Sequence, residues 1–410
     1  MTLRKGTISR RGLMVAGGAS VLSATVLRRP LWAAGKTVKI GVLLPTSGYL
    51  AHPGQSSRRG IDLAAKLLEG KAGMPVEVVH VDTESKPENG RLAAERLIQE
   101  GCTVLIGAFD SGATISAAQA CEEAGVPLIV NIASAPQVTE QGYTQVFRNF
   151  TPAATLVANA VKRIKDVTAG ASTKPKTAVV LHVNDTFGQA VNKGVGILWK
   201  KLGVPIEILD TISYDIRARD LKTEIARAKA AKPDLVLPIT RVNDAIAIVR
   251  EMVKQKFNPM GIIGPGSPGP YEKAFTDATG KYGNEYMVSV PWYDPTRDTT
   301  KAVIKAFNEM NPDKRFELNV GFSYEAMEIA YDAIKRAGSG DPKAIQAALK
   351  TTNLEDHVML GGPIQFNEKG QNTNIGGAML QIQNGEPVVV APESAAVAKP
   401  IFPMTPFNER

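Results

Sequence analysis

Residues suited to holding a small polar molecule gather in three short segments, each of which directly follows an apolar run. The segments are 46–50 (TSGYL), 108–112 (AFDSG) and 132–136 (IASAP). They are built from hydroxyls, glycines and other small side chains, so that backbone N–H groups and serine hydroxyls can approach a ligand closely. A small ligand with a carboxylate is the molecule that such donors suit best.

Three later segments have the same place in the pattern but a different chemistry. They are 184–188 (NDTFG), 240–243 (TRVN) and 264–270 (GPGSPGP). This second set adds an aromatic wall, Phe187, and a cation, Arg241, to the small polar groups of the first set. Together the two sets predict a binding site with polar and aromatic surroundings.

The elements that must position these segments are strands and helices in strict alternation. Apolar strands at 38–44, 76–81, 104–107 and 128–131 alternate with helical patterns at 56–68, 88–100 and 113–124. The same alternation begins again after Pro152. Its helices are expected at 153–165, 188–202, 220–231 and 244–256, and its strands at 177–183, 206–209, 235–239 and 260–264. This pattern predicts two α/β lobes, each a doubly wound parallel sheet. Ligands of such sheets bind beyond the carboxyl ends of the strands, which is where all six segments lie.

The positive charge of the chain is concentrated at its start. The formal net charge is +8, but residues 1–34 carry six basic residues and no acid, which leaves +2 for the rest. A nearly neutral body excludes a nucleic-acid partner as the reason for the basicity. A basic start, a short apolar run over 13–27 and small residues near Ala33 and Ala34 predict a signal peptide over 1–34. Ser9-Arg10-Arg11-Gly12-Leu13-Met14 resembles a twin-arginine signal, so we expect export to the periplasm.

Two cysteines, Cys102 and Cys121, fit an oxidising compartment. Cys102 begins a predicted strand and Cys121 lies late in the helix that follows it, so the two ends return to the same edge of the sheet. We expect a disulfide between them, and two buried free thiols are the alternative. The four histidines (His52, His80, His182 and His357) have no metal-ligand spacing, so we expect no metal.

Enzyme motifs are absent from the sequence or are poorly formed. Gly264-Pro265-Gly266-Ser267-Pro268-Gly269 matches G-x-G-x-x-G, but its prolines have no N–H to offer a pyrophosphate. No G-x-S-x-G or H-E-x-x-H string is present. We therefore expect no cofactor and no catalysis, and an exported enzyme is the weakest of the function classes.

At these same segments the chain resembles the leucine/isoleucine/valine-binding family, the periplasmic substrate-binding proteins of branched-chain amino-acid ABC transporters. The resemblance covers residues 38–385. It rests on the order and spacing of several strings: 39–48 (KIGVLLPTSG), 58–64 (RRGIDLA), 105–107 (LIG) with 111–113 (SGA), 122–129 (EEAGVPLI), 187–188 (FG), 331–333 (YDA) and 362–370 (GPIQFNEKG).

The resemblance implies two lobes joined by three crossing strands, with the ligand in the cleft between them. The crossings fall near 149–152, 291–293 and 353–358. The first lobe is then 35–150 with 292–355, and the second is 151–291 with 356–390. The tail 391–410, rich in alanine and proline, is expected to pack on the surface or to fray.

The resemblance also implies roles for individual residues. In amino-acid-binding members, one serine and a backbone-plus-hydroxyl pair hold the ligand carboxylate, and these positions match Ser111, Ile132 and Ser134. Tyr49 is expected at the cleft mouth, and Phe187 is expected to stack on the ligand in place of a tyrosine. The full set of ligand-binding candidates is Tyr49, Ser111, Gly112, Ile132, Ala133, Ser134, Phe187, Arg241, Gly266 and Ser267.

One departure from the family pattern bears on the ligand. Amino-acid binders place an acid at the position of Gly266, where it pairs with the ligand ammonium, and burial of an unpaired ammonium is costly. We therefore expect a carboxylate without an α-ammonium, such as an aromatic or keto acid. Asp110 is the alternative anion, since it can reach the ligand from the opposite lobe.

The resemblance implies a solute-binding protein that closes on its ligand and is recognised by an ABC permease in the inner membrane. We expect it to act as a monomer. A sensory module of the same fold, which presents its ligand to a membrane receptor, is the alternative. The chain ends at Arg410 without an apolar run that could cross a membrane, which favours the transport function.

Overall fold

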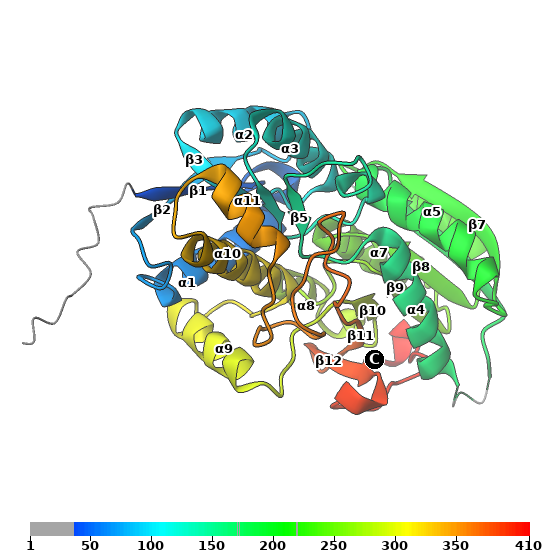
Figure 1. The fold of residues 1–410 in the computed structure, drawn as a ribbon. Coiled ribbons are helices and arrows are strands. Elements are labelled where there is room, and N and C mark those ends of the chain that lie inside the picture. Colours follow the sequence, from blue (N-terminus) through cyan, green and yellow to red (C-terminus); the bar gives the residue numbers. More distant parts are fainter. Residues whose placement is uncertain (1–36, 170, 172, 219) are drawn as a thin grey trace, which may run out of the picture. The chain divides into compact units, whose positions relative to one another are not determined.

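Two β-sheets organise the chain in the computed structural model, which describes residues 37–169, 171, 173–218 and 220–410 (Figure 1). Both sheets lie within the same compact unit of the chain. The predicted signal peptide, 1–34, lies outside the described residues. None of the helices in the described part combines the length and the apolar character that a membrane span requires.

The first sheet has the order β2-β1-β3-β4-β5, and all its pairs are parallel. Its strands are β1 (Val38–Leu44), β2 (Val76–Asp82), β3 (Cys102–Gly107), β4 (Leu128–Val130) and β5 (Val146–Arg148). The helices between them are α1 (Ala51–Leu67), α2 (Asn89–Gln99) and α3 (Ser111–Ala124).

Each face of the first sheet packs into a different apolar core. Val42 and Leu44 of β1 belong to the core that contains α1, whereas Leu43 between them belongs to the core of α2 and α3. Successive side chains of a strand point to opposite faces, so both faces must be covered by helices. The continuous apolar sequence of β1 is the consequence of burial on both faces.

The second sheet has the order β12-β11-β10-β9-β8-β6-β7. Its strands are β6 (Thr177–Val183), β7 (Glu207–Tyr214), β8 (Leu235–Ile239), β9 (Gly261–Pro265), β10 (Met287–Val290), β11 (Ala378–Gln383) and β12 (Glu386–Ala391). Pairs from β7 to β10 are parallel, and β11 and β12 add an antiparallel edge. The helices here are α4 (Ala153–Thr168), α5 (Thr186–Lys201), α6 (Lys222–Ala230), α7 (Val242–Lys254) and α8 (Lys273–Thr279). The predicted fold class, two doubly wound sheets, is confirmed.

After β10 the chain returns to the first sheet with α9 (Asp298–Met310), α10 (Leu318–Ala337) and α11 (Pro342–Lys350). Helix α10 lies against α1 (Figure 1). The contact is close at Gly60, where an added Cβ would lie 2.3 Å from the carbonyl oxygen of Val320. Only glycine fits this approach of one helix to the other.

A buried carboxylate on α10 ties two of the crossing segments together. One oxygen of Glu325 accepts hydrogen bonds from the backbone N–H groups of Val358 and Met359, at 3.0 and 2.8 Å. Its other oxygen accepts from Asn149 Nδ2 at 2.8 Å. His357 Nδ1 lies 2.8 Å from the same carboxylate. Segments that are about 200 residues apart in sequence are thus anchored on one side chain.

Several elements differ in length from their predicted bounds. Helix α1 begins at Ala51 instead of 56, because Pro53 falls within its first turn, where a missing N–H costs nothing. Strand β7 continues to Tyr214 instead of ending at 209. Strand β7 is the edge strand of its sheet, and exposed residues alternate along it with less exposed ones. Polar residues at the exposed positions interrupt the apolar run, so the run alone predicts a strand that is too short.

Of the two alternatives expected for the C-terminal tail, packing against the body of the protein is found and fraying is wrong. The backbone N–H of Met404 donates to the carbonyl oxygen of Met260 at 2.8 Å, and that of Phe407 donates to Asn258 Oδ1 at 2.9 Å. Both tail side chains are buried. The tail therefore extends the core of the second sheet at its amino-terminal edge.

The predicted disulfide is also wrong, because Cys102 and Cys121 are both free and buried. Strand β4, to which α3 leads, pairs Leu128 with Leu105 and not with Cys102. The helix therefore leads back to the sheet three residues beyond Cys102, the first residue of β3. Two buried free thiols, the alternative expected from the sequence, are what the structure has.

Candidate functional site

Loops from both sheets line a cavity, in which the space between atoms totals about 430 Å³ when space open to solvent is included. The cavity lies beyond the carboxyl ends of the parallel strands, as expected for a doubly wound sheet. Its lining consists of Phe109, Ser111, Ile132, Ala133, Ser134, Phe150, Phe187, Arg241, Gly266, Pro268, Tyr271, Val290, Pro291, Leu318 and Asn319.

Seven of the ten predicted ligand-binding residues line this cavity: Ser111, Ile132, Ala133, Ser134, Phe187, Arg241 and Gly266. The other three do not. Tyr49 lines a neighbouring small pocket, which also includes Arg241. An added Cβ on Gly112 would lie 3.0 Å from Pro87, and Ser267 is buried with its hydroxyl donating to the carbonyl oxygen of Pro238 at 2.5 Å. The contact of each residue with a ligand stays a prediction.

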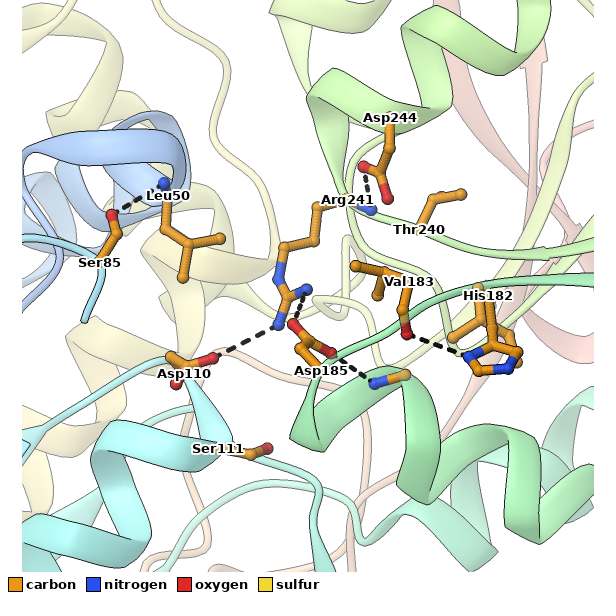
Figure 2. A network of polar contacts seen from close by, with 12 residues as sticks. Leu50, Ser85, Asp110, Ser111, His182, Val183, Asp185, Thr240, Arg241 and Asp244 are labelled. Carbon is orange, nitrogen blue, oxygen red and sulfur yellow. Dashed lines mark hydrogen bonds and ion pairs between the residues drawn. The ribbon is translucent and has the colours of Figure 1, made fainter. Parts of the chain in front are cut away.

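Arg241 joins the starts of three helices. Its guanidinium lies 2.5 Å from Asp185 Oδ2, at the start of α5, and 3.5 Å from Asp110 Oδ2, at the start of α3 (Figure 2). Arg241 itself is the N-cap of α7, and its backbone N–H donates to Asp244 Oδ1 at 2.7 Å. Since α3 belongs to the first sheet, the guanidinium bridges the two sheets.

The two acids around Arg241 are fixed by their own helices. Asp110 Oδ1 accepts from the backbone N–H of Ala113 at 3.0 Å, and Asp185 Oδ1 accepts from that of Gly188 at 2.7 Å. Each carboxylate thus caps its helix with one oxygen and faces Arg241 with the other.

Burial sets the electrostatics of this network. It raises the pKa of Asp110, although Arg241 opposes the effect. The pKa of Arg241 is also raised: burial lowers it, but Asp185 and Asp110 more than offset that effect. Two acids therefore share one cation, and both are paired without a ligand. Among the described residues that line the cavity, Arg241 is the only charged one.

Aromatic side chains form much of the cavity wall. Phe109, Phe150, Phe187 and Tyr271 all line it. The Phe187 ring also lies under Arg241, with 4.9 Å from the guanidinium carbon to the ring centroid. Phe109 has a φ of 69°, which is rare for a bulky residue and indicates a strained backbone in the loop after β3.

Several polar groups on the wall have no hydrogen-bond partner within the described part of the chain. These groups are the hydroxyl of Ser134, the hydroxyl of Tyr271 and both amide atoms of Asn319. All three side chains are buried, with exposed fractions of 1% or less. Each unpaired buried group costs about 1–3 kcal/mol, so groups of this kind are normally satisfied by water or a ligand. The cavity therefore offers several unused donors and acceptors.

Comparison with known proteins identifies the family. The model of the family described as periplasmic binding protein matches residues 37–386. The chain belongs to this family. The resemblance to Leu/Ile/Val-binding proteins is confirmed by Leu/Ile/Val-binding protein homolog 7 of Brucella abortus (strain 2308). The two are 25% identical over 395 residues, which cover 92% of this chain and 97% of the relative.

Two solved structures of periplasmic binding proteins show the same fold. The leucine-binding protein of Thermotoga maritima MSB8 matches this chain with a TM-score of 0.75 and 21% identity. The match covers 87% of this chain and 98% of the Thermotoga chain. The solute-binding protein of an ABC transporter from R. palustris, solved in complex with benzoate, has a TM-score of 0.76 and 22% identity. The match covers 88% of this chain and 98% of the R. palustris chain.

Gly266 is the position at which amino-acid-binding periplasmic binding proteins were expected to have an acid. Its φ is 79°, in the left-handed region that favours glycine. An added Cβ would also lie 3.0 Å from Cβ of Leu156. Both observations exclude a carboxylate side chain here without movement of the loop.

A buried arginine holds the loop that carries Ser134. Arg148, at the end of β5, donates from Nη1 to the carbonyl oxygens of Ala133 and Ala135 at 3.2 and 2.8 Å. It also donates from Nη2 to Thr139 Oγ1 at 2.8 Å. Burial lowers the pKa of Arg148 to about 9. This arginine positions the loop but does not line the cavity.

Sequence reasoning missed eight of the lining residues. Phe109 lies inside a predicted segment, and Pro268 and Tyr271 lie in or next to another, so a closer reading of those loops finds them. Phe150, Val290 and Pro291 lie at the crossings between the sheets. Leu318 and Asn319 begin α10, and no sequence signal places that helix end at the cavity.

Proposed function

We propose that this protein is the exported solute-binding component of an ABC importer and that it captures a small aromatic carboxylate between its two lobes. The observation that supports the ligand class is the cavity lining, in which aromatic walls and free hydroxyls surround a single charged residue, Arg241. A ligand carboxylate is suited to the hydroxyls of Ser111 and Ser134, near the start of α3.

An α-ammonium fits this cavity less well. Gly266 cannot carry an acid without strain, and Asp110 and Asp185 already face Arg241. An ammonium would have to separate one of these acids from Arg241 before it could pair with it. A ligand without an ammonium avoids that cost. The benzoate complex of the R. palustris solute-binding protein supports the same ligand class.

We propose that capture proceeds by closure of two lobes, comprising 35–150 with 292–355 and 151–291 with 356–390. The membership of β1–β5 in one sheet and β6–β12 in the other supports this division. A ligand that contacts both lobes favours the closed form, and a permease can then select that form.

Calorimetry with purified protein tests the ligand class. We expect benzoate or a substituted benzoate to bind and leucine not to bind. Ser134→Ala should weaken binding about ten- to hundred-fold, because it removes a hydrogen bond to a charged group. Ser116→Ala is the matched control, since its hydroxyl bonds to the carbonyl oxygen of Gly112 on the surface of α3. Tight leucine binding with no response to aromatic acids refutes the proposal.

Asp110→Asn separates the two ligand classes further. Asparagine can still cap α3, but it removes one of the two negative charges around Arg241. An aromatic carboxylate should bind this variant as well as or better than the wild type. A ligand whose ammonium uses Asp110 should bind it much more weakly.

We propose export to the periplasm through the twin-arginine signal at Arg10 and Arg11. The name of the family supports the compartment. Replacement of both arginines by lysine preserves charge, so it should retain the precursor inside the cell only if an exporter reads the arginine pair. Unchanged periplasmic recovery of the double variant would contradict the twin-arginine signal but not export itself.

A further inference from the structure

Two polar side chains that the proposed carboxylate site does not use also line the cavity. Tyr271 and Asn319 both line the cavity, both are fully buried, and the hydroxyl and both amide atoms have no partner among the described residues. Neither residue was a candidate on sequence grounds. They come from different parts of the chain, the segment before α8 and the first turn of α10.

The sequence neighbours of these two residues show that their segments meet. Tyr271 precedes Glu272, and Asn319 lies two residues after Glu317. Both glutamates line a second cavity, which also contains His52 and Ser56. The segment before α8 and the start of α10 therefore lie side by side where they line the main cavity.

Neither side chain is needed to complete the local structure. The backbone N–H of Asn319 donates to Glu317 Oε2 at 2.8 Å, so the start of α10 is capped without the asparagine amide. The Tyr271 ring packs edge-on against Trp292, with 5.3 Å between centroids. Packing therefore holds the tyrosine ring in place while its hydroxyl remains available.

We propose that Tyr271 and Asn319 form a second polar subsite that binds a ring hydroxyl, so that the solute is a hydroxylated aromatic carboxylate. This inference rests on the proposed function. A ring hydroxyl can donate one hydrogen bond and accept others. The asparagine amide and the tyrosine hydroxyl each provide both a donor and an acceptor for it. An uncharged hydroxyl is the substituent that these two groups suit, since Arg241, which is already paired with two acids, is the only charged residue among the described residues of the lining.

Calorimetric titration with benzoate, 3-hydroxybenzoate and 4-hydroxybenzoate tests the subsite. We expect at least one hydroxybenzoate to bind wild-type protein about ten-fold or more tightly than benzoate, because benzoate leaves the buried amide unpaired. Asn319→Leu, which keeps the size of the side chain, should abolish that preference. Tyr271→Phe should reduce the preference as well and serves as the second variant if Asn319→Leu does not fold.

The outcomes distinguish the two proposals. If benzoate and both hydroxybenzoates bind wild-type protein equally, the subsite is refuted and the proposed function stands. The subsite is also refuted if Asn319→Leu and Tyr271→Phe weaken benzoate and hydroxybenzoate by the same factor. If none of the three acids binds, both the proposed ligand class and the subsite are overturned. Ser134→Ala, at the proposed carboxylate site, should weaken the binding of all three acids by a similar factor.

Discussion

The guanidinium of Arg241, at the start of α7, lies 3.5 Å from the carboxylate of Asp110, at the start of α3, although the two helices pack on different sheets. Both side chains are buried, with exposed fractions of 6% and 10%. The pair therefore links elements of the two sheets, and Arg241 also lines the cavity. The proposed ligand carboxylate would bind beside this contact between the sheets.

Replacement of Arg241 by methionine should destabilise the protein by about 3–5 kcal/mol, because it leaves Asp110 and Asp185 buried without a cation. Affinity for the aromatic acid should fall at least a hundred-fold. Chemical denaturation and calorimetry measure the two effects. Arg217→Met is the control, since Arg217 pairs with Asp215 on the exposed surface and should leave both quantities unchanged. Wild-type stability of Arg241→Met would contradict the role of the buried network.

Replacement of Arg148 by methionine should destabilise the protein by roughly 3 kcal/mol, because the carbonyl oxygens of Ala133 and Ala135 lose their buried donor. Ligand affinity should fall with it, since these residues flank Ser134. Arg250→Met is the control, because Arg250 is exposed and contacts only the carbonyl oxygen of Ala278. If stability falls but ligand affinity does not, Arg148 has no part in positioning the loop.

The His52–Glu272 pair predicts that closure depends on pH. His52 on α1 hydrogen-bonds to Glu272, which precedes α8 at the second sheet. That hydrogen bond raises the pKa of His52 above 6.5. Protonated His52 stabilises this contact between the sheets fully below pH 6.5, and the effect is lost as the pH rises through the raised pKa. Ligand affinity should therefore decrease as the pH rises above 6.5.

His52→Gln should flatten this pH dependence, as measured by calorimetry in matched buffers. His80→Gln is the control, because His80 pairs with Asp62 within the first-sheet region and does not bridge the sheets. Glu317 lies near the pair, and burial raises its pKa to about 7. An acid with a raised pKa also favours the folded form at lower pH, so only the difference between wild type and His52→Gln reports the histidine. An unchanged slope in that variant would exclude the pair as the cause.

Both cysteines should remain unreactive thiols in the native protein. Burial raises the pKa of Cys102 to about 11 and that of Cys121 further above its usual value, so little thiolate forms at neutral pH. Ellman's reagent should detect no thiol before denaturation and two per chain afterwards. A reductant should leave the melting temperature unchanged. One or no thiol in the denatured, unreduced protein would indicate oxidation that this structure lacks.

The sequence determined the strands, the parallel doubly wound sheets and the loops that carry the cavity. Strands buried on both faces are continuous apolar runs, and the carboxyl ends of parallel strands must meet at one edge. Val38–Leu44 and Leu235–Ile239 have the bounds that their apolar runs predict. For the same reason Ser111, Ser134, Phe187 and Arg241 could be named as neighbours before any coordinates were known.

Only the tertiary structure decided what these neighbours pair with. Asp110 and Asp185 meet Arg241 because three helix starts converge, and no spacing in the sequence encodes that meeting. Asn319 reaches the cavity from a helix that follows the crossing between the sheets. Cys102 and Cys121 remain free thiols although both are buried in one core. Local patterns determine which elements form, whereas contacts between distant segments depend on how all the elements pack together.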